Sequence, residues 1–383
     1  MSRFTLGVNY WPRRSAMYMW ERFDLGEIRE DMTRIASLGL KLVRFFLLWE
    51  AFQPERDRIE PRMLERLSAF VQTASDAGLQ TIPTLFTGHM SGVNWLPRWS
   101  LDTRTPHGRF RTVSGRGTSP FGIGDFYADP ELLAAQVLFA REAGRVLAQH
   151  PAVYCWDLGN EFSNLREPRT PAEGAAWCAR LHDTLLDSSG IGITAGMHGE
   201  DFERDRHLRP SLMSRSWKVA TMHGYPVYAP FARDRMDPEV VPYYLELMRS
   251  FSDKPVLFSE FGNPECAGEH TSFACLSEEE MAIYCTAVLE RLHARGAIGA
   301  LWWCWADYVP ALADWPPCDR APHELHFGIV RNDGTEKPVA RALQLFAARA
   351  LRVREAPPAQ FNEASFYATL PGGLFANYRR YRS

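Results

Sequence analysis

Two glutamates carry the most specific chemical signal in this sequence. The short, largely apolar segments 156–160 (WDLGN) and 256–259 (VLFS) lead directly into Glu161 and Glu260. Two carboxyl groups that face each other can cleave a glycosidic bond, because one attacks the sugar or activates water while the other supplies a proton. The pattern therefore predicts a two-carboxylate site, if the fold brings together residues that are ninety-nine positions apart.

A (β/α)8 barrel places strand ends of this kind at one face. Such a barrel takes about 250 residues, so one strand-helix unit takes about 31 and three units take roughly 94. The ninety-nine residues between Glu161 and Glu260 fit the ends of strands 4 and 7. Because the C-terminal ends of all eight strands meet at the catalytic face, both carboxylates are expected there.

Hydrophobic patterning repeats along the chain as a barrel requires. The expected strands are 4–10, 42–49, 79–87, 153–161, 192–198, 219–225, 255–262 and 297–306. The expected helices are 26–39, 61–78, 129–150, 172–189, 239–251, 277–296 and 338–354. No clear helical pattern covers 199–218, where the fifth helix should lie. The predicted fold is α/β, a single-domain (β/α)8 TIM barrel over 1–356. The C-terminal extension 357–383 is expected to pack on the barrel or to be partly flexible.

The connection after the third strand is unusually long. Residues 88–128 contain seven glycines among scattered Trp, Phe and Tyr residues, whereas loops of this type usually have 2 to 6 residues. We expect this insertion, together with segment 307–326, to close one end of the cleft and leave room for one sugar beyond the scissile bond. A solvated insertion without substrate contacts is the alternative.

The residues at the strand ends resemble those of a known family. The matching positions, in order along the chain, are Arg44, His89, Asn160 with Glu161, His223 with Tyr225, Glu260, and Trp303. They resemble glycoside hydrolase family 5, in clan A of the retaining glycosidases, over about residues 4–350. The resemblance implies a hydrolase of β-linked oligosaccharides that needs no cofactor and no metal.

This resemblance also implies roles for the matching residues. Glu260 is expected to be the nucleophile and Glu161 the acid and base. Arg44 and Tyr225 are expected to keep Glu260 ionised, because a cation and a hydroxyl donor favour the charged form of a carboxyl group. The remaining matching residues are expected to support catalysis or to bind sugar: Asn160 at the sugar 2-hydroxyl, His223, His89, and Trp303 as a stacking face.

Further substrate contacts are expected from position alone. Asn9 and Trp11 end the first strand, and Trp49 ends the second. Trp305 and Asp307 continue on the side of Trp303 if strand alternation persists, while Trp302 points into the core. Each of these residues could instead have a purely structural role. The residues named here could pack at the rim of the barrel, the two glutamates could cap helices, Arg44 could form an ion pair without catalytic consequence, and the histidines could hold loops in place.

Composition excludes several function classes. The formal net charge is −3, with 43 Lys and Arg residues against 46 Asp and Glu residues, and the arginines are dispersed, so nucleic acid is not an expected partner. No apolar stretch has the length of a membrane span or of a leader ahead of the first strand, so no membrane contact and a cytoplasmic location are expected.

The cysteines do not indicate a disulfide framework. Their number, seven, is odd, and a core of this size needs no disulfides. Cys266, His270 and Cys275 have the spacing of a zinc clip but lack a fourth ligand nearby, so no metal site is predicted.

The sequence leaves the sugar open. One catalytic frame serves glucosides, mannosides and galactosides in such barrels. A cytoplasmic enzyme would meet short imported oligosaccharides, which favours an exo-acting β-mannosidase. The alternatives are a β-glucosidase or β-galactosidase, an endo-β-mannanase or glucanase, and a transglycosylase with the same residues. The alternative of another class is a carbohydrate-binding barrel without catalysis, against which the retained catalytic set argues.

Overall fold

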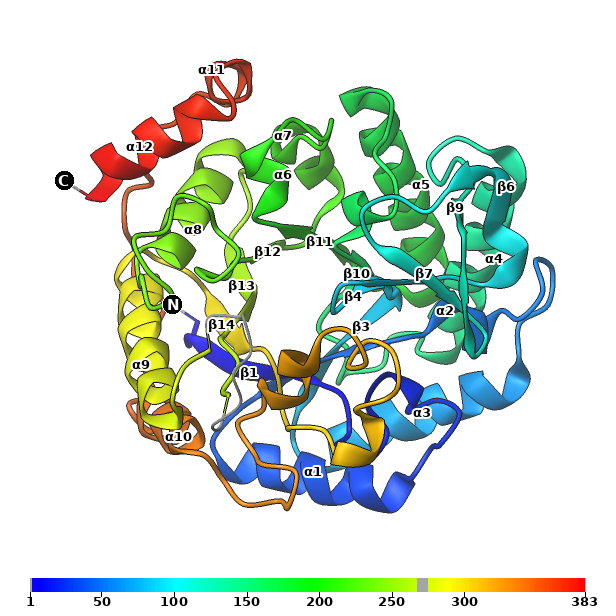
Figure 1. Ribbon diagram of the computed structural model, residues 1–383, viewed down its shortest axis with the longest axis horizontal. Helices are drawn as coiled ribbons and strands as arrows, with labels where there is room; N and C mark the ends of the chain where they lie inside the picture. Colours follow the sequence, from blue (N-terminus) through cyan, green and yellow to red (C-terminus); the bar gives the residue numbers. More distant parts are fainter. Residues whose placement is uncertain (1, 267–274, 383) are drawn as a thin grey trace.

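The computed structural model describes residues 2–266 and 275–382, and its centre is a closed barrel of eight parallel strands (Figure 1). The strands follow the order β1-β14-β13-β12-β11-β10-β3-β2, and β1 pairs with both β14 and β2 to close the ring. This confirms the predicted (β/α)8 fold, and every barrel strand lies within its expected segment: β1 (Thr5–Tyr10), β2 (Leu42–Phe46), β3 (Gln80–Phe86), β10 (Trp156–Asn160), β11 (Ile193–His198), β12 (Ala220–His223), β13 (Val256–Phe261) and β14 (Gly299–Trp302).

Long helices surround the barrel, and capping residues in the sequence fix where several of them begin. The Asp24 carboxylate accepts from Gly26 N and Glu27 N, and Ser277 forms a capping box with Glu280. Where 199–218 showed no helical pattern, the structure has only short turns, α6 (Glu200–Glu203), α7 (Pro210–Met213) and η4 (Ser214–Ser216). The long helices are α1 (Leu25–Ser37), α3 (Pro61–Asp76), α4 (Pro130–Val146), α5 (Pro171–Ser189), α8 (Val240–Phe251), α9 (Glu278–Ala294) and α10 (Pro338–Ala348).

The inside of the barrel changes from apolar to polar along the strands. Leu42, Ile82, Leu257 and Leu301 belong to one buried apolar cluster that is separate from the main core. Side chains two residues apart point to the same face of a strand, so the next inward positions on β2 and β3 are Arg44 and Thr84, and both side chains contact Asp157. The strand pattern therefore places a polar layer above an apolar one, at the end of the barrel where the strands finish.

The 88–128 insertion is built of short strands rather than an open loop. Four of them form a sheet in the order β4-β5-β7-β8, and two others pair as β6-β9. Figure 1 shows this structure beside the C-terminal ends of β3 and β10. The elements are β4 (Gly88–Met90), β5 (Val93–Trp95), η2 (Arg98–Ser100), β6 (Leu101–Pro106), β7 (Arg111–Ser114), β8 (Gly117–Ser119) and β9 (Phe121–Ile123).

Segment 307–326 is fastened to this insertion. It contains the short turns η5 (Pro310–Leu312) and η6 (Pro322–His326). Arg111 Nη1, in β7, lies 2.7 Å from Asp319 Oδ2. Tyr18 lies between the two segments, because its ring meets Trp95 and Trp315 edge-on and its hydroxyl donates to the Pro316 carbonyl at 2.9 Å. The two segments expected at one end of the cleft are thus in direct contact.

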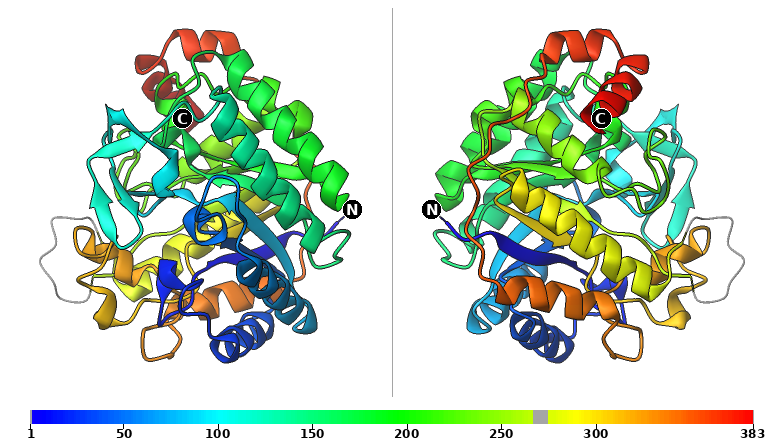
Figure 2. Two further views of the ribbon diagram at one scale, coloured as in Figure 1. Left: turned by 90° about the vertical axis from the view of Figure 1, so that its right-hand side faces the viewer. Right: turned by 90° about the vertical axis from the view of Figure 1, so that its left-hand side faces the viewer.

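The C-terminal extension lies against the outside of the barrel as α11 (Glu363–Ala368) and α12 (Gly372–Arg382), at the edge of the molecule in Figure 2. Phe366 packs on Phe251, and Tyr378 packs on Tyr243. The Tyr378 hydroxyl donates to Asp237 at 2.7 Å. In the described part of the chain, no helix combines the length and the apolar character that a membrane crossing needs.

One cysteine pair departs from the sequence-based expectation. Cys266 and Cys275 form a disulfide, which corrects the expectation that the chain has none and leaves neither sulfur for a zinc clip. His270, the third residue of that clip, lies outside the described residues. The remaining free cysteines are buried: Cys155, Cys178, Cys285, Cys304 and Cys318.

Candidate active site

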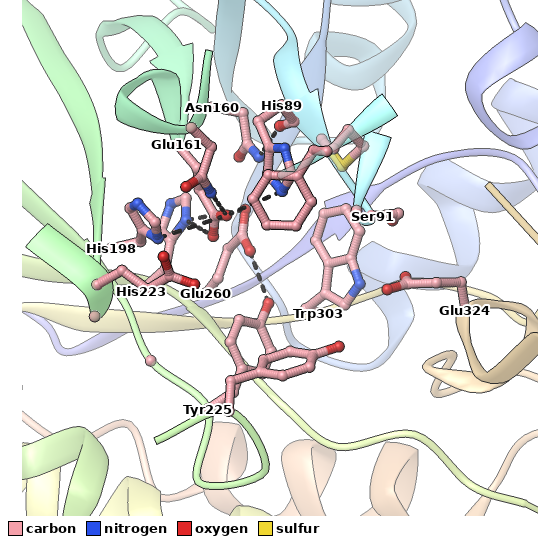
Figure 3. A pocket seen from close by; sticks show the side chains of 18 of the residues that line it. His89, Ser91, Asn160, Glu161, His198, His223, Tyr225, Glu260, Trp303 and Glu324 are labelled. Carbon is pink, nitrogen blue, oxygen red and sulfur yellow. Dashed lines mark hydrogen bonds and ion pairs between the residues drawn. The ribbon is translucent and has the colours of Figure 1, made fainter. Parts of the chain in front are cut away.

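A pocket of about 240 Å³ lies at the C-terminal ends of the barrel strands (Figure 3). The insertion and segment 307–326 both contribute to its lining. Seven of the residues predicted from the sequence line it: His89, Asn160, Glu161, His223, Tyr225, Glu260 and Trp303. Residues that are up to 214 positions apart in the chain therefore meet in one cavity.

The two glutamates face each other across this pocket. One carboxylate oxygen of Glu161, one of Glu260 and a ring nitrogen of His223 all lie within 4.8 Å of one another. Retaining glycosidases hold their carboxyl groups about 5–5.5 Å apart, and inverting ones about 6.5–9.5 Å apart to admit a water molecule. The observed separation fits direct attack by one carboxylate and is shorter than the separation that inverting enzymes use.

The backbone at the end of β10 aims Glu161 into the pocket. Glu161 has φ 48° and ψ 41°, in the left-handed region that non-glycine residues seldom adopt. Its N–H donates to the Gly196 carbonyl at 3.1 Å. A Cβ on Gly196 would lie 2.3 Å from the Gly159 carbonyl oxygen, so this close approach of β11 to β10 requires glycine. The turn that presents the acid is therefore fixed by its neighbours.

Arg44 joins the floor of the pocket into one network. Its Nε and Nη2 lie 2.8 Å and 2.7 Å from Asp157 Oδ2, and its Nη2 donates to Asn160 Oδ1 at 2.8 Å. Its Nη1 donates to Asn9 Oδ1 at 3.1 Å and pairs with Glu260. The guanidinium is buried, and a buried cation is stable only when it is paired and hydrogen-bonded. This network holds Glu260 and Asn160 in place before any ligand arrives.

The environments of the two glutamates differ in a way that suits different roles. Burial raises the pKa of Glu260, but the Arg44 cation and the Tyr225 hydroxyl, which donates to Glu260 Oε2 at 2.7 Å, oppose the rise. Burial raises the pKa of Glu161 well above its ordinary value, and repulsion from Glu260 adds to this effect. Glu161 is thus the carboxyl group that keeps its proton, and Glu260 is the one that is stabilised as an anion.

The histidines around Glu161 add hydrogen-bonding groups without adding charge. His223 Nδ1 lies 3.1 Å from Glu161 Oε1, and burial lowers the pKa of His223 well below its ordinary value. His89 Nε2 lies 3.9 Å from Glu161 Oε2, and burial lowers the pKa of His89 to about 4. Neutral rings do not pull the Glu161 pKa down as imidazolium ions would, so they are compatible with an acid that works near neutral pH.

Three residues expected at the pocket are buried and do not line it. Asn9 donates to the carbonyls of Ser259 and Trp302 and accepts from Arg44, so its amide is fully engaged below the cavity. Trp11 is buried and stacks on Phe46, with ring centroids 5.3 Å apart. Trp49 is buried and donates to Gln53 at 2.7 Å. The predicted substrate contacts of Asn9, Trp11 and Trp49 are corrected, because hydrogen bonds and packing inside the protein already occupy these side chains.

Trp305 and Asp307 are also not brought to the pocket. Trp305 is buried beneath the Arg34 guanidinium, which lies 5.6 Å from its ring centroid. Asp307 forms an ion pair with buried Lys337 at 2.8 Å and accepts from Gly328 N. The alternation that predicted their direction ends with β14 at Trp302, so the prediction extended a strand that had already finished. Trp302 is buried, as expected.

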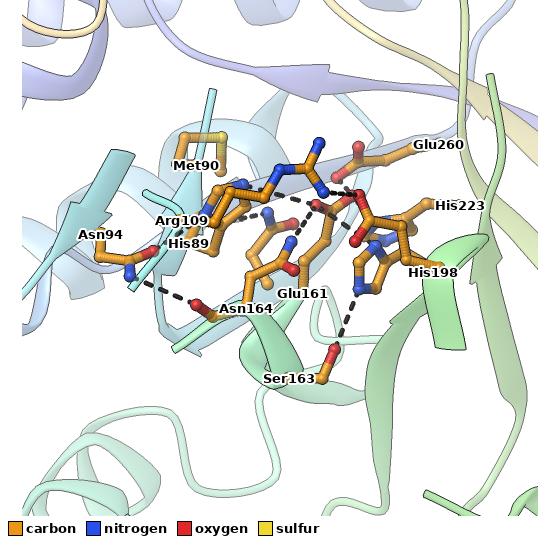
Figure 4. Close-up of polar contacts among 12 residues, drawn as sticks. His89, Met90, Asn94, Arg109, Glu161, Ser163, Asn164, His198, His223 and Glu260 are labelled. Carbon is orange, nitrogen blue, oxygen red and sulfur yellow. Dashed lines mark hydrogen bonds and ion pairs between the residues drawn. The ribbon is translucent and has the colours of Figure 1, made fainter. Parts of the chain in front are cut away.

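The sequence reading missed a polar cluster on the β11 side of the pocket. His198 Nδ1 lies 3.7 Å from Glu161 Oε2, and its Nε2 meets Ser163 Oγ at 3.0 Å (Figure 4). Arg206 is buried and forms an ion pair with Glu200. Glu200 Oε1 also accepts a hydrogen bond from Arg109 Nη1, in the insertion, at 2.8 Å. His198 ends its apolar segment just as the predicted residues end theirs, and that signal could have found it.

Replacing Tyr225 with phenylalanine tests the electrostatics of Glu260. A hydrogen bond to a charged group contributes about 1.5–3 kcal/mol, so we expect kcat/KM to fall about 10- to 100-fold. Because the hydroxyl stabilises the anion, its loss raises the Glu260 pKa and moves the acidic limb of the pH profile to higher pH. Tyr127→Phe, which removes a buried hydroxyl bonded to the Arg166 carbonyl away from the pocket, should change neither. An unmoved acidic limb in Tyr225→Phe would contradict this role.

Comparison with known proteins yields no match in sequence and clear matches in structure. No family model matches the chain, and no curated protein matches it. A GH5_18 structure from Streptomyces cattleya in complex with GlcNAc is 25% identical, with a TM-score of 0.77 over 94% of this chain and 82% of that chain. An exo-beta-1,4-mannosidase, Op5Man5 from Opitutaceae bacterium strain TAV5, is 27% identical, with a TM-score of 0.74 over 91% of this chain and 60% of that chain. Another GH5_18 structure from Streptomyces cattleya, with Manb1-4GlcNAc, is 23% identical with a TM-score of 0.81 and supports the fold.

Proposed function

We propose that this glycosidase is a retaining, exo-acting β-mannosidase that hydrolyses short β-linked oligosaccharides. The observation that carries the proposal is the asymmetric pair of carboxyl groups. Glu161 and Glu260 lie within 4.8 Å of each other, and both the cation of Arg44 and the hydroxyl of Tyr225 are directed to Glu260. An anionic nucleophile beside a protonated acid is what retention by double displacement needs.

In the first step a Glu260 oxygen attacks the anomeric carbon. The bond from this carbon to the leaving oxygen breaks, and Glu161 gives that oxygen its proton. Arg44 and Tyr225 hold Glu260 in line for the attack. The Asn160 side-chain nitrogen already donates to the His89 carbonyl at 2.6 Å, and its second hydrogen is available for the sugar 2-hydroxyl. The products are a glycosyl ester on Glu260 and a free aglycone.

In the second step Glu161, now ionised, takes a proton from a water molecule. The water oxygen attacks the anomeric carbon from the face that the aglycone has left, and the ester bond to Glu260 breaks. Two inversions return the β-configuration. Burial lowers the pKa of His198 as it does that of His223, so both rings are neutral. Neutral neighbours do not hold Glu161 in its charged form, so this residue can act first as an acid and then as a base.

Exo action is proposed because segments on two sides of the pocket are tied together. Arg109 of the insertion reaches Glu200 beside β11, and Arg111 reaches Asp319 in segment 307–326. Both segments line the pocket. This arrangement favours a site for one glycone sugar at a chain end over an open groove. Similarity to an exo-beta-1,4-mannosidase at 27% identity supports mannose as that sugar. A cytoplasmic location stays a prediction.

A panel of aryl β-glycosides with mannose, glucose, galactose, xylose and fucose as the glycone tests this proposal. We expect kcat/KM to be highest on the mannoside, by at least about tenfold, since sites built to bond particular hydroxyls reject sugars that misplace them. Mannobiose and Man-β-1,4-GlcNAc should release mannose as the first product. A preference for another glycone would overturn the sugar assignment. Mannan viscosity that falls before monosaccharide appears would overturn exo action, and no hydrolysis of any glycoside would favour a binding barrel.

A further inference from the structure

Besides Glu161 and Glu260, the pocket is lined by three carboxyl groups that have no part in the double displacement: Glu200, Glu203 and Glu324. Glu324 lies in η6, within segment 307–326, and its side chain is only 7% exposed. Trp303 lies between Glu260 and Glu324 in Figure 3. Glu324 is therefore separated from the reacting carboxylates by the ring against which a sugar would stack.

Glu324 has no cationic partner in the part of the chain that the structure describes. Its carboxylate oxygen lies 3.6 Å from His323 Nε2, but burial lowers the pKa of His323 to about 4, so this ring is neutral near pH 7. Among residues 2–266 and 275–382, no Lys or Arg nitrogen lies within 4.0 Å of the Glu324 carboxylate. Burial raises the pKa of Glu324 to about 7, and the nearby Ser91 hydroxyl opposes the rise. A buried carboxylate with so few donors is costly unless a ligand supplies more.

Ser91 belongs to the opposite segment and is also unsatisfied. It follows β4 in the insertion, lines the pocket and has φ 55°. Its hydroxyl oxygen is buried and has no hydrogen-bond partner among the described residues. Two polar groups, one from each of the segments that Arg111 and Asp319 tie together, thus meet at the pocket without bonding one another at ordinary distance. A ligand hydroxyl placed between them would satisfy both.

We propose that Glu324 and Ser91 form the end of the glycone subsite and bind the sugar 4-hydroxyl with one of its neighbours. The 4-hydroxyl lies across the pyranose ring from the anomeric carbon, as Glu324 lies across Trp303 from Glu260. Glu324 accepts hydrogen bonds from these hydroxyls, and Ser91 bonds one of them. A hydroxyl that carries another sugar has no hydrogen to donate, so this pair selects chain ends. The inference rests on the proposed function and names the residues that give the site its exo specificity.

The test is a cycle that pairs protein variants with deoxy substrates. We would measure kcat/KM of the wild type and of Glu324→Ala on the preferred aryl β-glycoside and on its 3-, 4- and 6-deoxy analogues. For the wild type, kcat/KM should be about 10- to 100-fold lower on the 4-deoxy analogue than on the parent glycoside, which is the effect of a hydrogen bond to a charged group. For Glu324→Ala, kcat/KM on the parent glycoside should fall by a similar factor. In that variant, kcat/KM on the 4-deoxy analogue should be less than about threefold below its value on the parent glycoside. Ser91→Ala should reduce the same penalty in part.

Two controls keep the result interpretable. Glu265→Gln alters another buried carboxyl group outside the pocket, whose backbone N–H is bonded to the His326 carbonyl of η6, and it should keep the wild-type deoxy penalties. If Glu324→Ala does not fold, Glu324→Gln keeps the size of the side chain and is tested in the same way, with thermal unfolding as the check.

If the Glu324 variants hydrolyse the glycoside but lose as much kcat/KM on each deoxy analogue as the wild type does, this inference alone is overturned. No hydrolysis of any glycoside by the wild type would overturn the proposed function, and the subsite with it.

Discussion

Replacing Glu260 with glutamine is expected to reduce turnover by at least about 10⁴-fold with every leaving group, because removal of a nucleophile eliminates the covalent route. The amide is nearly the same size and can still accept from Tyr225, and Arg44 keeps its contacts with Asp157, Asn160 and Asn9. The fold should therefore persist, as thermal unfolding would verify.

The comparison across leaving groups is decisive for Glu260. Aryl glycosides whose leaving groups range from good to poor would be assayed with the wild type and the variant. A nucleophile is needed for all of them, so the loss should not shrink as the leaving group improves. A variant that recovers most of its activity on the best leaving group would show that Glu260 acts as the acid instead.

Glu161→Ala is expected to behave in the opposite way. Substrates with poor leaving groups should lose activity by about 10²–10⁴-fold, the usual contribution of a positioned general acid. An activated leaving group needs no proton, so the first step should stay fast and glycosyl-enzyme should accumulate. Azide needs no general base and fits the space left by the side chain. It should restore turnover and yield the β-glycosyl azide.

The pH profile of Glu161→Ala gives an independent check. Burial and the nearby Glu260 charge raise the Glu161 pKa, so the wild type should lose activity on the alkaline side as this group deprotonates. Without the side chain, the alkaline limb of kcat/KM should disappear on an activated substrate, while the acidic limb set by Glu260 remains. An alkaline limb that survives, together with no azide rescue, would void the assigned role.

The barrel could be predicted because its signals are local and repeated. Each strand is a short apolar segment and most helices carry their own caps, such as Asp24 and Ser277, so errors at one boundary do not spread to the next. The gap of ninety-nine residues between the glutamates then fixed which strands carry them. The fifth crossover gave no such pattern, and the structure has only short turns there.

The pocket was harder to predict beyond the strand ends. Trp303 lies one residue past β14 and lines the pocket, whereas Trp305 and Asp307 follow a changed backbone course and do not. Glu324 and Ser91 come from irregular segments, and their meeting depends on long-range contacts such as Arg111 with Asp319. No periodicity encodes such contacts. The sequence could indicate that these segments matter but could not say which side chains they present.

Mapping the covalent intermediate tests the central claim most directly. A 2-deoxy-2-fluoro-β-mannosyl fluoride slows both steps but carries a good leaving group, so the ester accumulates. After proteolysis, mass spectrometry should find one fluorosugar on the peptide that contains Glu260, and none in Glu260→Gln. A label on Glu161, or full activity on mannosides with no labelled carboxylate, would contradict the account.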